Sequence, residues 1–472
     1  MSDKVSKIRS DYSTDARLKR LIFLLMPTKL SVILFRRFVD ENRERNSIEA
    51  AKFLVDTNNI YPTRFYFLIG KFLRFSLALG DVKLPKSYVS EIIKSLKETH
   101  QNPSKRRGAC EQILNTTSKL SPQQTSAHGW KLVSLALSGL GFIRAGTIAR
   151  NYCLTSALSE VTSGNASNRT TSLAIKGLLE SRRFEEARQL IESQSSGIDT
   201  LSVDDTYIDY LALLIQRRPE VRVQGPVVES EVEKLFANLV SGKRIALVAP
   251  GVIDKEYGQE IDSHDTVFRV KFNGRSAMPN EKYVGRRCDI TSHNSDLLTL
   301  AKLDKKTENR LTLEAPDLKL LISKRDDTIE LGSTPVKQMR SWPPTFLTTG
   351  TSGTLALFEI LRQSPKKVKM FGFDFYSIRQ QYNTELLQIY NSREFTKATE
   401  LPSNEFNFEF SQSGSAKIAL ALISHDLKSD FLLVKNLYEL SGLIDGTPEV
   451  LEILNLTADE YDARLEEMLG DW

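Results

Sequence analysis

The sequence predicts an all-α domain over residues 1–222, followed by an α/β domain over residues 223–472. Three observations lead to this division. A chain of 472 residues is too long for one ordinary hydrophobic core, so two or three domains are expected. Residues 40–220 have a helical pattern with few clusters of β-branched residues. After residue 242, short apolar runs alternate with helical stretches, which indicates a mainly parallel sheet with helices on both faces.

The composition is that of an ordinary globular protein, with 40% apolar and 26% charged residues. The net charge of +5 is spread along the chain, and no nucleic-acid-binding module is visible, so we expect no nucleic-acid partner. This mild excess of positive charge suits an anionic substrate or an anionic membrane surface. Cys110, Cys153 and Cys288 are scattered and odd in number, which predicts neither a disulfide framework nor a zinc site. A reducing, cytoplasmic location follows.

No signal peptide is expected, because the first fifteen residues are mostly polar. The apolar run at 18–37 is interrupted by Pro27 and Lys29. Neither piece approaches the ~20 apolar residues needed to span a bilayer. Two interpretations remain, a buried helix–turn–helix and a basic interfacial anchor that would give peripheral contact with a membrane.

The helical half contains an internal sequence repeat, in which residues 135–150 resemble residues 173–188. Gly139 corresponds to Gly177, and Ala149 to Ala187. Small residues in both helices of a pair permit close crossing, as in tetratricopeptide-like hairpins. The sequence leaves open a short α-solenoid and a plain helical bundle.

The second half begins with a linker at 217–226, which contains two prolines and a glycine. A helix at 227–240 follows and ends at Gly242. The acidic tail, 447–472, predicts one amphipathic helix that packs along the domain, with partner docking as the alternative. The expected strands are 245–249, 266–271, 288–292, 318–322 and 367–372, and the expected helices between them include 352–363 and 414–427.

Residues 243–296 carry the strongest local pattern. The apolar run 245–249 predicts a buried strand, and Pro250-Gly251 stops it in a turn whose backbone N–H groups are free to meet a ligand. A polar loop, a second strand and a polar tip follow. This order is typical of a nucleotide pocket at the strand ends of an open, Rossmann-like sheet, although many α/β folds share it.

The same stretch resembles the large sialyl motif of the sialyltransferases of glycosyltransferase family 29. The matching residues are Gly258, Ile261, Asp262, His264, Asp265, Val267, Arg269, Asn273, Val284, Gly285 and Asn294. Two shorter matches follow in the family's order. Residues 347–375 resemble the small motif, with Thr348-Thr349-Gly350 and Phe371-Gly372-Phe373 at its two ends. His425 and Asp430-Phe431 resemble the very small motif, in which the family has Glu in place of Asp430. The resemblance covers only the C-terminal half.

The resemblance implies a Rossmann-like, GT-A-variant glycosyltransferase domain. The implied reaction is inverting transfer of sialic acid from a CMP-activated donor to a hydroxyl of a glycan or glycolipid acceptor. CMP-Kdo carries the same nucleotide and a similar sugar acid, so a Kdo transferase is the close alternative. No convincing D-x-D pair stands at a strand end, and a CMP leaving group has one phosphate that hydrogen-bond donors can hold. We therefore expect no metal and no other cofactor.

The resemblance also suggests the residues of the site. His425 is the expected general base, because an imidazole can take a proton from a hydroxyl near neutral pH. Thr349, Gly350 and Thr351 are expected to cap the following helix and to face the ribose or phosphate of the donor, two roles that are compatible. Amide side chains suit cytosine and ribose because they both donate and accept hydrogen bonds. The full set of expected donor-binding residues is Gly251, Asn273, Asn294, Thr349, Gly350, Thr351 and Gly372.

Two histidines of the large and very small motifs have different expected roles. His264 is expected to orient its loop by hydrogen bonding, with Asp265 anchoring backbone amides. The chemistry is instead expected of His425.

Several positions depart from the family's pattern. The residues Val270-Lys271-Phe272 lengthen the spacing before Asn273. The phosphate-binding histidine of the family's third motif is missing, since Phe408-Glu409-Phe410 stands there, and Tyr376 or the turn at 413–415 is the conjectured substitute. The family's disulfide is absent, with Ile245 and Pro365 near its positions. These departures leave open a second class of function, a non-catalytic helical adaptor with a degenerate transferase fold.

Overall fold

The structure is a computed structural model that describes residues 84–195, 210, 231–272, 281–294, 318–322, 335–339, 343–378 and 425–469. The chain divides into two compact units, Met1–Lys94 and Ser95–Trp472. The expected domain boundary at residue 222 falls inside the second unit, and the division there stays a prediction. The apolar run at 18–37 and the linker at 217–226 lie outside the described residues.

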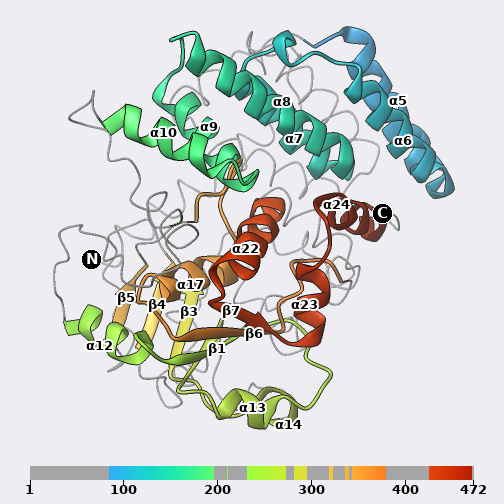
Figure 1. Ribbon diagram of the computed structural model, residues 1–472. Helices are drawn as coiled ribbons and strands as arrows, with labels where there is room; N and C mark the ends of the chain where they lie inside the picture. The colour runs from blue at the N-terminus through green and yellow to red at the C-terminus, as the bar shows by residue number, and fades with distance from the viewer. Residues whose placement is uncertain are drawn as a thin grey trace, which may run out of the picture. The chain divides into compact units, whose positions relative to one another are not determined.

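Seven parallel strands form one sheet in the order β5-β4-β3-β2-β1-β6-β7 (Figure 1). The chain therefore builds outward from β1 to β5 on one side, then returns to place β6 and β7 on the other side of β1. Their bounds are β1 Arg244–Val248, β2 Thr266–Val270, β3 Ile290–Asn294, β4 Leu318–Ile322, β5 Val336–Gln338, β6 Lys367–Phe371 and β7 Ile444–Gly446.

All five predicted strands are present, and the prediction of a parallel α/β sheet is confirmed. β1 is buried from Ile245 to Val248, as expected for a strand with helices on both faces. Ala246 and Val248 pack with Ile261, Val267 and Phe371 in the core of the sheet. The prediction missed β5 and β7, because a strand of three residues is too short to show a periodic pattern.

The helices of the α/β region are α12 Glu231–Val240, α13 Gly258–Asp262, α14 Glu281–Val284, α17 Ser352–Leu361, α22 Leu427–Ser441, α23 Pro448–Leu454 and α24 Ala458–Met468. Every residue of α17 from Thr354 to Leu361 is buried, which explains its almost continuous apolar sequence.

Two predicted helices were wrong in detail. The acidic tail forms two helices, α23 and α24, because Thr457 and Glu460 make a capping box that starts a new helix. The predicted helix at 414–427 is not helical at residues 425 and 426, which precede the first residue of α22. Asp426 is the N-cap of α22, and its side chain accepts a hydrogen bond from the Ser429 N–H at 3.1 Å.

The helical region consists of α5 Lys86–Gln101, α6 Arg106–Ser118, α7 Ala127–Gly139, α8 Ile143–Thr162, α9 Asn168–Glu180 and α10 Phe184–Ser195, with short 3₁₀ turns at Pro103–Lys105 and Pro122–Gln124. From α7 to α10, each helix packs on the next along the chain. Both segments of the repeat span a helix–turn–helix. The two turns, at 140–142 and 181–183, do not fall at equivalent positions of the repeat.

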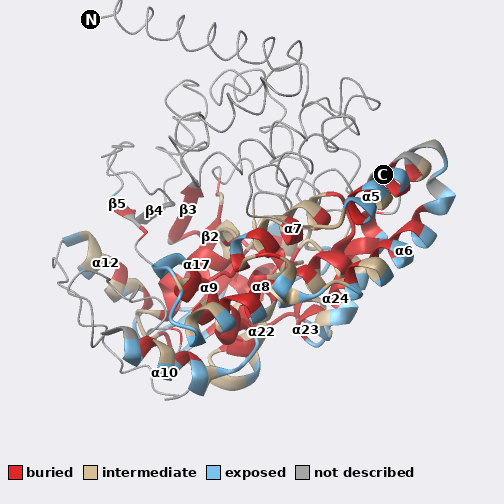
Figure 2. Ribbon diagram, turned by 90° about the horizontal axis from the view of Figure 1, so that it is seen from above, coloured by how far each residue is buried: buried red, intermediate tan, exposed pale blue. Residues whose placement is uncertain are grey.

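The helical region packs directly on the α/β region within the second unit. Helix α8 contacts α24, and α9 contacts α22. Much of α8, α9 and α22 is buried, as Figure 2 shows. These contacts bring α8 and α9 behind the segment that carries His425.

Two further expectations can be compared with the described residues. None of the described helices is long and apolar enough to cross a membrane. Cys110, Cys153 and Cys288 are all buried and free of disulfide bonds. Burial raises the pKa of the Cys110 and Cys153 thiols to about 12, so these groups stay protonated.

Candidate functional site

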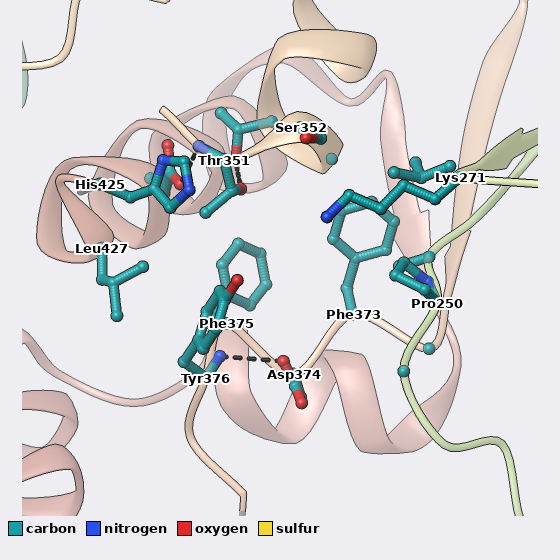
Figure 3. A pocket seen from close by; sticks show the side chains of 17 residues that line it. Pro250, Lys271, Thr351, Ser352, Phe373, Asp374, Phe375, Tyr376, His425 and Leu427 are labelled. Carbon is teal, nitrogen blue, oxygen red and sulfur yellow. Dashed lines mark hydrogen bonds between the residues drawn. The ribbon is translucent and has the colours of Figure 1, made fainter. Parts of the chain in front are cut away.

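A pocket lies at the carboxyl ends of β1, β2 and β6, where the strand order reverses on either side of β1. In open α/β sheets this switch point is where ligands bind. The start of α17 and the segment before α22 complete the wall (Figure 3). The enclosed cavity is ≈ 100 Å³, smaller than the ~300–1,000 Å³ of sites that hold a whole small-molecule ligand. A larger ligand would therefore place only part of itself in this cavity.

The turns after β1 and β6 lie against each other at one side of the pocket. A Cβ atom on Gly251 would lie 2.3 Å from the carbonyl oxygen of Gly372, so a side chain at position 251 would force the two turns apart. Gly372 also has a φ of +67°, which favours glycine. Two expected donor-binding positions thus present backbone, not side chain, to the pocket.

The N-terminus of α17 opens on the pocket. Thr351 is the N-cap, but its side chain caps no N–H group of the helix. The predicted capping position is therefore correct, although the cap uses the Thr351 backbone and not its side chain. The Thr351 N–H donates to the Asp430 carboxyl at 2.7 Å. The first N–H groups of a helix have no partner within the helix, so the pocket faces a group of donors suited to an anion.

His425 lies across the pocket from Lys271, and Thr351 and Tyr376 lie between them (Figure 3). The backbone of His425 forms a parallel β-bridge with Thr349, and the Asp426 N–H donates to the Thr349 carbonyl at 2.9 Å. The Asp426 carboxylate accepts from the Leu347 N–H at 2.7 Å. The histidine is thus held by its backbone between two segments far apart in the sequence.

Two carboxyl groups of the pocket are buried enough to change their protonation. Burial raises the pKa of Asp430 to about 7, although the Thr351 N–H partly offsets this. Burial likewise raises the pKa of Asp374 to about 7, against a lowering by the Tyr376 N–H. That N–H lies 2.9 Å from Asp374 Oδ1, while Oδ2 is buried and without a hydrogen bond from the described residues. Both groups exchange protons near neutral pH.

Strained backbone is concentrated at the same place. Lys271, Phe375 and Tyr376 have φ angles of 60°, 47° and 59°, in the left-handed region that side chains other than glycine rarely adopt. All three residues line the pocket. Backbone held in such conformations costs of order 1–3 kcal/mol per residue and recurs at functional sites. The strain here marks the pocket as the functional part of the sheet.

Lys271 is the pocket residue that the sequence analysis missed. By sequence it is only the end of the predicted strand 266–271 and part of the added spacing between Arg269 and Asn273. In the structure it directly follows β2, and its ammonium end is directed into the pocket (Figure 3). A basic residue at the last position of the predicted strand 266–271 was the available signal.

Four of the expected site residues line the pocket, namely Gly251, Thr351, Gly372 and His425. Thr349 and Gly350 do not line it. They support Thr351 from behind, where a Cβ on Gly350 would lie 2.8 Å from Asp430 Oδ1. Asn294 is the last residue of β3, but its side chain is outside the described part of the structure, as is all of Asn273.

Most of the large-motif residues lie at the opposite, amino end of the sheet. Asp265 accepts from the Arg244 N–H at 2.8 Å, and this hydrogen bond, with the Arg244 side chain, lowers its pKa. His264 Nδ1 lies 2.9 Å from the Glu260 carbonyl oxygen. The expected loop-orienting roles of His264 and Asp265 are confirmed.

Two more large-motif residues hold the loop before β3. Asp262 accepts from the Arg286 N–H at 2.8 Å and the Arg287 N–H at 2.9 Å. Arg269 donates to the carbonyl oxygens of Arg287 and Val284, each at 2.6 Å. These side chains join loops that are distant in sequence and do not reach the pocket.

The described residues include no group of three or more His, Cys, Asp or Glu side chains that could hold a metal ion. The pocket instead offers backbone N–H groups, one ammonium, one imidazole and two carboxyl groups. This set of groups can bind a monoanionic or dianionic ligand and transfer a proton next to it.

No protein-family model matches the chain, and no curated protein matches it.

Proposed function

We propose that the protein is an inverting glycosyltransferase that moves a sugar acid, sialic acid or Kdo, from a CMP-activated donor to a hydroxyl of a glycan or glycolipid. One observation carries the proposal. Three segments that are far apart in the chain line one pocket at the switch point of the sheet: the turn after β1 with Gly251, the small-motif segment with Thr351 and Gly372, and the very small motif with His425.

The phosphate of the donor would bind between α17 and Lys271. The N–H groups of the first turn of α17 favour an anion, and the ammonium of Lys271 supplies the positive charge. This arrangement gives Lys271 the role of the missing third-motif histidine. It also supports a leaving group that needs no bound metal, because CMP departs with one phosphate.

His425 would act as the base. The acceptor oxygen attacks the anomeric carbon while the bond from that carbon to the phosphate oxygen breaks. The hydroxyl proton passes to the imidazole of His425, and the electron pair of the broken bond leaves with CMP, whose phosphate gains one negative charge. A single displacement of this kind inverts the configuration at the anomeric carbon.

The test measures CMP release by the purified protein from CMP-sialic acid and from CMP-Kdo, each with and without a glycan acceptor. Release that depends on the acceptor, from one donor only, is the expected result and identifies the sugar. Thermal unfolding with added CMP provides the control for binding, since a ligand at a hundredfold excess over Kd stabilises by ~2.7 kcal/mol. Release from neither donor, together with no shift at millimolar CMP, would overturn the proposal in favour of a non-catalytic adaptor.

A further inference from the structure

A buried polar cluster joins the helical region to the segment that carries His425. Its four members are Arg150 of α8, Glu180 of α9, and Asp426 and Ser429 at the start of α22, all no more than 8% exposed. Arg150 Nε donates to Glu180 Oε1 at 2.7 Å, and Arg150 Nη1 lies 2.9 Å from Asp426 Oδ1. Arg150 Nη2 also donates to Ser429 Oγ at 2.6 Å. One guanidinium thus connects three groups from two distant parts of the chain.

The cluster holds both segments of the bridge between Thr349 and His425. Asp426, next to His425, accepts from the Leu347 N–H at 2.7 Å. Ser429 Oγ accepts from the Phe346 N–H at 2.9 Å and donates to Glu180 Oε2 at 2.6 Å. The Arg150 guanidinium also lies over the Phe346 ring, 4.9 Å from its centre. The N–H groups of Phe346 and Leu347 therefore donate to Ser429 and Asp426, and both of these side chains contact Arg150.

The charges of the cluster make its geometry specific. Burial alone would raise the pKa of Asp426, but the Arg150 guanidinium and the N–H groups of Leu347 and Ser429 together outweigh burial and lower it, so Asp426 is ionised. A buried carboxylate that loses its cation is strongly destabilised. The position of the Asp426 carboxylate therefore depends on the position of the Arg150 guanidinium. The orientation of that guanidinium is in turn set by its bidentate pairing with Glu180.

We propose that Arg150 and Glu180 are positioning residues, which hold the imidazole of His425 in the place where it accepts the proton. The helical region then helps to position a residue of the proposed active site. This inference rests on the proposed function for its catalytic consequence, but the position of His425 can be measured without any turnover.

The experiment compares three variants in the full chain. Arg150→Lys keeps the positive charge but loses the bidentate geometry of the guanidinium. Glu180→Gln keeps the shape of the side chain but loses its negative charge. Arg144→Met is the matched control, because Arg144 also joins α8 to the C-terminal helices, through Glu466 at 2.7 Å, without contacting the His425 segment. Turnover, CMP affinity and thermal stability are measured for each variant. The chain has only five histidines, so the His425 ring can be observed by NMR with labelled histidine and assigned with His425→Gln.

Arg150→Lys and Glu180→Gln should each lower kcat by about ten- to a hundredfold, the range expected when a reacting group is displaced by about 1 Å. Their CMP affinity should stay within about twofold, and the His425 resonance should move. Arg144→Met should lower the melting temperature while leaving kcat and the His425 resonance unchanged.

Two results would overturn the inference: an unchanged His425 resonance in Arg150→Lys, or an equal loss of kcat in Arg144→Met. Failure of the proposed function gives a different result. Wild-type protein would then release no CMP from either donor, while the His425 resonance would still respond to Arg150→Lys.

Discussion

At the amino ends of β1, β2 and β3, acidic groups are satisfied by backbone N–H groups and arginines, and the pKa of Asp265 is lowered. At the carboxyl ends, Asp374 and Asp430 are buried, and their pKa values are raised to about 7. The two ends of the sheet also differ in backbone strain. Among the described residues, three of the five non-glycine residues with positive φ line the pocket at the carboxyl ends.

This difference separates residues that stabilise the fold from residues that serve a ligand. Paired charges at the amino end lower the free energy of the folded state. Buried carboxyl groups and left-handed backbone at the carboxyl end raise it, and such costs persist where they serve function. Substitutions at the two ends should therefore have opposite consequences for stability and for activity.

The largest effect is expected for His425→Ala. The fold and CMP affinity should stay nearly intact, because the bridge to Thr349 uses the backbone of His425. Turnover should fall by ~10²–10⁴, the contribution of a positioned base. Wild-type activity should rise with pH in the neutral range, and steady-state kinetics should show that the contribution of the imidazole to this rise is lost in the variant. Full activity with an unchanged pH profile would make His425 a structural residue.

Asp430→Asn tests the cost of the buried carboxyl group. The folded state holds the Asp430 proton up to a pKa of about 7, whereas the unfolded chain releases it near 3.8. The contribution of Asp430 to stability is therefore full below about pH 4 and is lost as pH rises through 7. The asparagine can still accept from the Thr351 N–H but cannot ionise.

The variant should gain on the order of 3 kcal/mol over wild type at pH 8 and nothing at pH 4, as measured by urea unfolding across this range. If the unfolding free energies of wild type and Asp430→Asn differ by the same amount at every pH, Asp430 is not the group that titrates.

Lys271→Met tests the phosphate site. Losing a charge-assisted hydrogen bond should weaken CMP binding by about ten- to a hundredfold, as measured by calorimetry. Lys243→Met is the control, because Lys243 is an exposed lysine just before β1, at the amino end of the sheet. Equal CMP affinity in both variants would exclude Lys271 from the phosphate site.

Asp262→Ala should have the smallest effect, and on stability alone. It leaves the N–H groups of Arg286 and Arg287 without their carboxylate, at a cost of about 1–2 kcal/mol in urea unfolding. CMP affinity should be unchanged, since Asp262 lies at the amino end of the sheet. If Asp262→Ala lowers CMP affinity without lowering stability, the amino end of the sheet binds the ligand, and the roles assigned to the two ends of the sheet are wrong.

The sequence was sufficient for the elements whose patterns are local. The strands around 245–249 and 367–372 and the helix that begins at Ser352 are long enough for their apolar residues to show a period or a continuous run. The motif order also identified four pocket residues. It did not separate these from the large-motif residues at the other end of the sheet, because a loop before a strand and a loop after it are adjacent in sequence but far apart in space.

Only the tertiary structure decided the rest. The strands β5 and β7 exist because neighbouring strands offer them hydrogen-bonding partners, which no three-residue pattern can indicate. Lys271 reaches the pocket through a backbone angle that its sequence does not predict. Arg150 meets Asp426 across 276 positions of the chain. Sequence patterns report local periodicity and residue type, whereas burial, strain and charge pairing between distant segments arise only when the chain has folded.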